Sequence, residues 1–204
     1  MSAILQPLIE TGRLWRGQGT APRRDALPTG FDALDRVLPG GGWPRAALSE
    51  ILFPADGVGE LRLLLPALAM LSREARPSVL VAPPYLPFPA AWIAAGMDLR
   101  YLQIVQAGES DVLWAAEQCL RSAACAAVLC WPRQADNATL RRLQLAAETG
   151  QTIGFMLRPA QVATQASMAA VRIGIETGPP RLRVLKCRGG NPPVQAVAFA
   201  ALAA

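Results

Sequence analysis

The chain has 204 residues, enough for one compact α/β domain with short appendages and too few for two ordinary domains with separate cores. Hydrophobic residues make up 52% of it, and no run approaches the roughly 18 uninterrupted apolar residues that a membrane span needs. The first residues lack the pattern of a secretion signal, so we expect a cytoplasmic protein. The net charge of +5 permits a nucleic-acid or acidic partner without establishing one.

The residue types that most often carry chemistry are scarce. No histidine is present, so the commonest general base and metal ligand is missing. Four cysteines, Cys119, Cys125, Cys130 and Cys187, lie in apolar stretches with no close pair. Because the spacing of a zinc site is absent, we expect buried free thiols and no cofactor. These features argue against an enzyme.

In chain order, the first expected element is a short amphipathic helix over residues 2–11, with its aliphatic side chains on one side. A basic stretch rich in small residues, 18–28, then indicates an exposed linker. We therefore divide the chain into an N-terminal helix and linker, residues 1–27, and a core domain, residues 28–204.

The core domain alternates short apolar runs with helical patterns. We predict strands over 47–52, 79–83, 101–106, 126–131, 152–157, 171–176, 181–187 and 194–199. We predict helices over 30–38, 89–96, 110–123 and 137–150, and one that follows Gly59 and kinks at Pro66. Strands separated by helices indicate a doubly wound parallel sheet, and the last three strands, joined by short turns, indicate an antiparallel extension. The expected class is α/β.

The stretch FPADGVGELRL, residues 53–63, has the strand, loop, helix order of a phosphate-binding loop. Gly57 and Gly59 supply its tight backbone, whose amides would face a phosphate. Glu60 stands where the lysine belongs, and Leu61 replaces the hydroxyl that would bind magnesium. Asp56 would repel a triphosphate. We expect the Glu60 carboxylate to interact with the helix macrodipole in place of a phosphate.

Two further parts of an ATPase are also missing. The strand over 126–131 ends in Cys130 and Trp131, where an aspartate would hold the metal. The strand over 79–83 leads into PPYLPFP, where a carboxylate would activate water. Since phosphoryl transfer depends on these charges and their placement, the sequence predicts a degenerate nucleotide site with no catalytic residue and no metal ligand.

The order of segments resembles the RecA core. LPTGFDALDRVLPGGGWPR at 27–45 is similar to its start, and VRIGIETGPPRLRVLKCRGGNPP at 171–193 is similar to its end. LWRG at 14–17, GVGELRLLLPAL at 57–68 and VLKCRGG at 184–190 add a resemblance to the ImuA family within that superfamily. The resemblance implies a RecA-like P-loop NTPase-type core, a mostly parallel sheet flanked by helices, with antiparallel C-terminal strands.

The resemblance also implies a function. ImuA proteins take part in damage-induced, error-prone translesion synthesis, as non-catalytic members of a complex called the mutasome. The implied partners are ImuB, a relative of Y-family polymerases, an error-prone polymerase of the replicative type, and RecA. The alternative is an SOS cell-division inhibitor like SulA, another shortened RecA relative, which binds the tubulin-like division protein. A third reading is a RecA relative with weak binding to DNA or ATP.

Several residues are candidates for contacts with a partner or with DNA. Lys186 and Arg188 match a basic pair that reaches the nucleotide of a neighbouring RecA subunit, and otherwise they simply lie on an edge strand. Leu14, Trp15 and Arg16 either dock on a partner or pack on their own domain.

The RecA loops that grip DNA correspond here to short segments. They leave Arg133 and Arg158 as candidates for phosphate contacts, or else as solvated residues. Direct DNA binding is therefore predicted to be weak.

Overall fold

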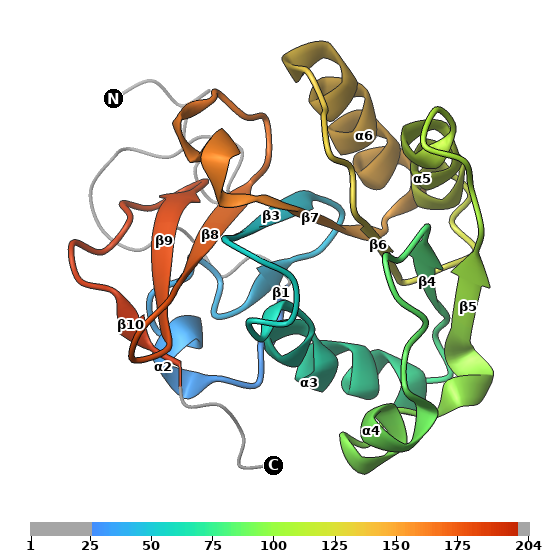
Figure 1. Ribbon diagram of the computed structural model, residues 1–204, viewed down its shortest axis with the longest axis horizontal. Coiled ribbons are helices and arrows are strands. Elements are labelled where there is room, and N and C mark those ends of the chain that lie inside the picture. The colour runs from blue at the N-terminus through green and yellow to red at the C-terminus, as the bar shows by residue number, and fades with distance from the viewer. Residues whose placement is uncertain (1–25, 200–204) are drawn as a thin grey trace, which may run out of the picture.

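Figure 1 shows the computed structural model of the chain, which describes residues 26–199. Residues 1–25 and 200–204 lie outside that part. The predicted helix over 2–11 and the candidate contacts Leu14, Trp15 and Arg16 therefore fall outside the described residues. The division of the chain at residues 27 and 28 stays a prediction.

The centre of the fold is an eight-stranded mixed sheet with the order β10-β9-β8-β3-β7-β6-β4-β5. Six neighbouring strands run parallel, from β8 through β5, and β9 and β10 run antiparallel to their neighbours. The strands are β3 (Leu48–Phe53), β4 (Ser78–Val81), β5 (Leu102–Val105), β6 (Ala127–Cys130), β7 (Ile153–Pro159), β8 (Val171–Glu176), β9 (Arg181–Cys187) and β10 (Val197–Ala198). A separate two-stranded sheet pairs β1 (Ala26–Leu27) with β2 (Trp43–Pro44).

Helices cover both faces of the sheet (Figure 1). On one face lie α2 (Asp32–Asp35), α3 (Glu60–Arg73) and α4 (Pro89–Ala94), and on the other lie α5 (Val112–Arg121) and α6 (Asn137–Gly150). Two short 3-10 helices, η1 (Leu99–Tyr101) and η2 (Ala160–Thr164), follow α4 and β7. The two core clusters on the two faces share strands, which makes the described residues one packed unit.

The central strands form because their residues are apolar on both faces. All residues of β3, β4 and β6 are buried, as parallel strands covered by helices require. Trp43 and Phe155 meet edge to face with ring centroids 5.2 Å apart in the core beneath α3. The structure confirms, to within a few residues, the seven strands predicted between residues 47 and 187. In place of the strand predicted over 194–199 it has the two-residue strand β10.

Pro66 does not interrupt its helix, because α3 continues through it from Glu60 to Arg73. The start of the α2 region packs on this proline. A Cβ added at Gly30 would lie 2.4 Å from the Pro66 side chain, so only glycine fits there. Gly30 also has a φ of +87°, which glycine adopts without strain.

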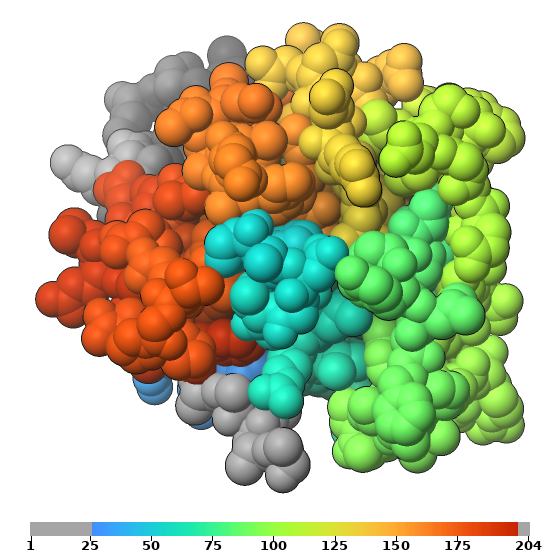
Figure 2. Space-filling view, in the orientation of Figure 1, coloured from blue at the N-terminus to red at the C-terminus, as the bar shows by residue number. Residues whose placement is uncertain are grey.

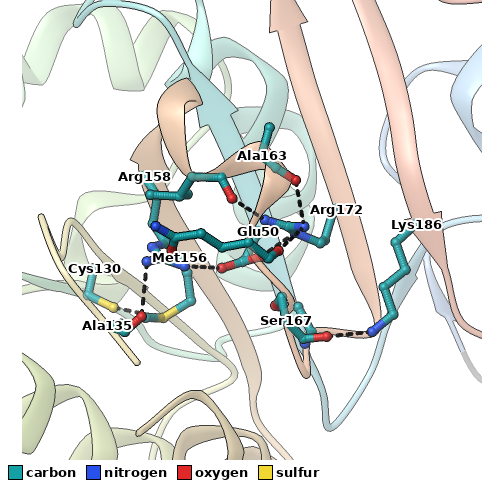
Figure 3. Close-up of polar contacts among 12 residues, drawn as sticks. Glu50, Cys130, Ala135, Met156, Arg158, Ala163, Ser167, Arg172 and Lys186 are labelled. Atoms are coloured by element: carbon teal, nitrogen blue, oxygen red, sulfur yellow. Dashed lines mark hydrogen bonds and ion pairs between the residues drawn. The ribbon is translucent and has the colours of Figure 1, made fainter. Parts of the chain in front are cut away.

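A buried ion network joins three neighbouring strands of the sheet. Glu50, in the middle of β3, is fully buried and accepts hydrogen bonds from Arg158 at 2.7 Å and from Arg172 at 2.6 Å (Figure 3). Arg172 lies directly opposite Glu50 in the register of β3 and β8, and Arg158 comes from β7 on the other side. One carboxylate therefore fixes the alignment of β7, β3 and β8.

The same two arginines hold the segments that follow β6 and β7. Arg158 donates to the carbonyl of Ala135 at 3.1 Å, and Arg172 donates to the carbonyls of Val162, Ala163 and Gln165 in and after η2. Arg172 thus uses its remaining donors on backbone oxygens, and Arg158 uses its Nη2, whereas the buried Nε of Arg158 has no hydrogen-bond partner among the described residues. These bonds offset part of the cost of burying three charges.

The substitution Glu50→Gln should lower the free energy of unfolding by about 3 to 5 kcal/mol, because it leaves two buried guanidinium groups without a counter-charge. Urea denaturation followed by circular dichroism measures the loss. Asp98→Asn is the control, since it removes the carboxylate of an exposed ion pair with Arg100 and should leave the midpoint near that of the wild type. Equal midpoints for Glu50→Gln and the wild type would contradict the structural role of the network.

Candidate functional site

The carboxyl ends of the parallel strands meet along one edge of the sheet. Ligands of open α/β sheets bind at this edge, where the connections leave toward opposite faces. The connection after β4 leads to α4 on one face, and the connection after β6 leads to α6 on the other. Figure 2 shows the loop after β3 in cyan beside the segment after β4 in green. This edge is the candidate site.

The glycine loop after β3 is occupied by the protein's own side chain. Gly57 and Gly59 have φ values of +80° and +107°, and their amides donate to the two carboxylate oxygens of Glu60 at 3.0 and 3.1 Å. Glu60 is only 8% exposed. The amides that would face a phosphate in a phosphate-binding loop therefore have an internal acceptor.

Apolar side chains pack against the glycine loop on the side that faces the core. The Phe199 ring lies 3.1 Å from the position of a Cβ at Gly59 and meets Phe31 edge to face. Leu61 is half-buried and packs on the core. Asp56 is exposed and lines a hollow between the loop and Trp131.

A groove runs along the edge between the connections. One hollow of about 700 Å³ is lined by the segments after β4, β5 and β6, and a second of about 400 Å³ reaches the glycine loop. Both share Pro84, Trp131, Pro132 and Arg133. The backbone of Ala82, at the start of this groove, has a φ of +48°, a strained value for a residue with a Cβ.

An exposed apolar surface lies next to the groove. Tyr85, Leu86, Phe88 and Ile93 are 71%, 73%, 71% and 59% exposed, and we refer to them as the apolar patch. The patch lies on the segment after β4 and on the short helix α4. Trp92 of the same helix is 3% exposed and packs in the core, which holds the patch in place. The sequence predicted the helix of this segment and the absence of a catalytic carboxylate, but it did not indicate an exposed apolar surface.

The candidate contact residues from the sequence are scattered. Arg133 is exposed and lies 3.9 Å from Glu109, also exposed, at the mouth of the groove. Arg158 is not a surface residue: it is 1% exposed and paired with Glu50, so it cannot contact DNA or a partner. Lys186 and Arg188 lie together at the end of β9, away from the glycine loop.

The four cysteines are free, as predicted, and three of them are buried. Burial raises the pKa of Cys125 to about 11 and that of Cys130 to about 12. Such thiols stay protonated at neutral pH and are poor nucleophiles. Within residues 26–199 no group of three or more Cys, Asp or Glu residues is arranged to hold a metal ion.

Among the described residues, no helix is long and apolar enough to cross a membrane.

The comparisons with known proteins agree with one another. The family model described as cell division inhibitor SulA matches residues 46–154. Cell division inhibitor SulA of Pectobacterium carotovorum is 32% identical over 115 residues, which cover 55% of this chain and 68% of that protein. SulA of Photorhabdus laumondii is 32% identical over 113 residues, covering 54% and 63% of the two chains.

Among solved structures, the crystal structure of SulA from Pseudomonas aeruginosa is similar, with 30% identity and a TM-score of 0.48. The similar region covers 56% of this chain and 98% of that chain.

These findings correct several predictions. The resemblance to ImuA is wrong, and with it the role in translesion synthesis and the partners ImuB, the error-prone polymerase and RecA. The expected fold class, a RecA-like P-loop NTPase-type core, is likewise replaced by that of a SulA-family protein with a mixed sheet. The alternative reading, a cell-division inhibitor, is the one that the comparisons support. They also support the prediction that the protein is not an enzyme.

The matched residues 46–154 make up more than half of the chain. They include the glycine loop, the apolar patch and most of the groove, and they leave out β1, β2, most of β7 with the groove residues Leu157 and Pro159, and the strands from β8 onward. Most of the candidate site therefore lies within the part that the family shares, and the chain belongs to the family of the cell division inhibitor SulA.

Proposed function

We propose that this protein is an SOS-induced inhibitor of cell division that acts in the cytoplasm by binding the tubulin-like division protein. The observation that carries the proposal is the apolar patch, which lies inside the region shared with the SulA family. The inhibitor acts by covering a surface of its partner and catalyses no reaction.

The patch has the composition of a protein-binding surface. Soluble monomers rarely expose large apolar side chains side by side, and such patches mark interaction sites. Tyr85 and Phe88 supply aromatic rings, which are enriched at the centres of interfaces and among the residues that dominate binding energy. Leu86 adds apolar area on the same segment as the two rings, and Ile93 adds it on α4.

The patch is held in place before a partner arrives. Pro83, Pro84, Pro87 and Pro89 restrict the backbone of the segment, and the last of them begins α4. Trp92 anchors the helix in the core. A surface that is already ordered loses less conformational entropy on binding, so more of the contact energy appears as affinity.

The glycine loop supports the non-enzymatic reading. Its amides are satisfied by Glu60, and β6 ends in Cys130, which is buried and stays protonated. We therefore regard the loop as a degenerate nucleotide site whose phosphate position is taken by Glu60. In this proposal its remaining role is structural, since it closes the joint between β3 and α3.

The double variant Leu86→Ala/Phe88→Ala should weaken binding to the purified division protein by roughly tenfold or more, because two central apolar anchors are removed. Isothermal titration calorimetry measures the affinity, and the length of cells that overproduce the variant reports the inhibition. Leu145→Ala is the matched control, since Leu145 is 53% exposed on α6. If the double variant bound and filamented cells as the wild type does, the patch would not be the binding surface.

The substitution Glu60→Ala should lower the free energy of unfolding by about 1 to 3 kcal/mol, because the amides of Gly57 and Gly59 lose a charged acceptor. Thermal and urea denaturation measure the change. Neither the wild type nor Glu60→Lys/Leu61→Thr should release phosphate from Mg·ATP, since the carboxylates expected after β4 and β6 are also absent. ATP hydrolysis by the wild-type protein would refute the structural role given to the loop.

A further inference from the structure

The positive charge of the chain is concentrated in its C-terminal part. Residues 1–154 contain fourteen basic and fourteen acidic side chains, and residues 155–204 contain six basic and one acidic. The whole net charge of +5 therefore arises beyond the region that matches the SulA family, which ends at residue 154. The excess of positive charge is therefore a feature of the C-terminal strands that the match to the SulA family does not explain.

Two of the six basic residues are used inside the fold. Arg158 and Arg172 are buried and bind Glu50. The other four, Arg181, Arg183, Lys186 and Arg188, lie on β9 or directly after it. The only acidic side chain of this part, Glu176, is paired with Arg183.

A bulge in β9 brings these four cations to one face of the sheet. Arg181 lies opposite Glu176 and Arg183 opposite Gly174, but Lys186 lies opposite Arg172, so that Leu185 is an extra residue in the strand. In a regular strand, side chains two residues apart share a face, and Lys186 would point away from Arg183. The extra residue reverses the alternation, as bulges do.

The burial of β9 agrees with this arrangement. Leu182, Val184 and Cys187 are buried in the core on the α3 face, and the four cations point to the opposite face. On that face α5 and α6 pack against β4, β6, β7 and β3. Among the described residues, the face over β8 and β9 is covered by the segment from η2 to β8, which packs on Arg172 and Lys186, and at its end by Glu148 of α6, which lies 3.7 Å from Arg188. We refer to Arg181, Arg183, Lys186 and Arg188 as the basic row.

The basic row has both exposed and partly buried members. Arg181 is exposed and Arg183 is 46% exposed at its side chain. Lys186 donates to the carbonyl of Ser167 at 2.7 Å (Figure 3), and Arg188 donates to the carbonyl of Met168 at 3.2 Å. Burial and then the neighbouring Arg188 and Arg172 hold the pKa of Lys186 below its usual value. Lys186 is thus repelled by its cationic neighbours, and an added anion would relieve this repulsion.

Apolar side chains stand between the cations. Leu185 is 36% exposed, Met168 is 40% exposed, and Val194, whose carbonyl accepts a hydrogen bond from Arg183, is 91% exposed. Residues 156–198 contain no phenylalanine, tyrosine or tryptophan. Proteins that bind single-stranded nucleic acid stack bases on aromatic side chains, and residues 156–198 supply none to this face. The mixture of arginine and aliphatic side chains instead complements carboxylates alternating with apolar groups.

We propose that the basic row is a docking site for an acidic segment of a protein that carries apolar side chains between its carboxylates. The planar guanidinium groups of Arg181 and Arg183 bind the carboxylates, and Leu185 and Val194 contact the apolar side chains. This surface lies outside the family match and is distinct from the apolar patch, so the inference does not rest on the function proposed above.

A labelled peptide of alternating glutamate and leucine, titrated with the full chain and followed by fluorescence anisotropy, tests the proposal. Arg181→Glu/Arg183→Glu should weaken its binding roughly tenfold, with most of the loss at low salt, because two exposed charges are reversed. Arg62→Glu/Arg141→Glu changes the net charge equally at exposed positions of α3 and α6 and should bind as the wild type does. A peptide of alternating glutamate and serine should bind several-fold more weakly.

Other outcomes would overturn the proposal. An oligothymidylate that binds as tightly as the glutamate–leucine peptide would make the row a nucleic-acid site. Self-association that the Arg181→Glu/Arg183→Glu variant abolishes, without peptide binding by the wild type, would make it an interface between two copies of the chain. An equal loss in both charge-reversed variants would show non-specific attraction. Circular dichroism of each variant confirms that the fold is retained.

Discussion

The ion pairs of the Glu50 carboxylate with Arg158 and Arg172 are the interaction on which the alignment of the central strands depends. The carboxylate lies at the centre of β3 with Arg172 opposite it on β8 and Arg158 on β7, so three strands share one counter-charge. Slippage of either neighbouring strand would separate a buried guanidinium from its partner, at a cost of several kcal/mol by the usual scale for broken buried pairs. The two arginines also fix η2 and the segment after β6 through backbone carbonyls. The network thus determines both the strand register and the path of two connections.

At the carboxyl edge, where α/β proteins commonly bind ligands, the protein's own charges occupy the glycine loop and hold two connections beside the groove. Glu60 satisfies the amides of the glycine loop, Arg158 holds the segment after β6, and Arg172 holds the segment after β7. The segment after β4 is organised differently, because its prolines and the buried Trp92 support side chains that point outward. A fold that fills its ligand positions internally and exposes aromatic rings beside them is suited to binding a macromolecule rather than to catalysis.

The sequence predicted local structure better than it predicted ancestry. Uninterrupted apolar runs in the sequence located β4, β6 and β7, because a parallel strand that is buried on both faces needs apolar side chains at successive positions. The start of α6 at Asn137 was also predicted, and the side chain that caps it is that of the preceding Asp136. The resemblance to ImuA was wrong because most of its motifs, at 14–17, 27–45 and 184–190, lie outside residues 46–154, which decide the family. The burial of Arg158 was not foreseeable, because Glu50 is 108 residues away in the chain and carries no local signal.

The family boundary at residue 154 also divides the physical character of the surface. Before it lie the apolar patch and a balanced set of charges, and after it lie the strands with the excess of arginine. The two parts are not separate domains, since β7 begins at Ile153, and Arg158 and Arg172 must both reach Glu50 on β3. The C-terminal strands could therefore be altered at the basic row without disturbing the patch, but their removal would leave Glu50 buried without Arg172 and expose one side of β3. For this reason the two surfaces should be separated by point substitutions rather than by truncation.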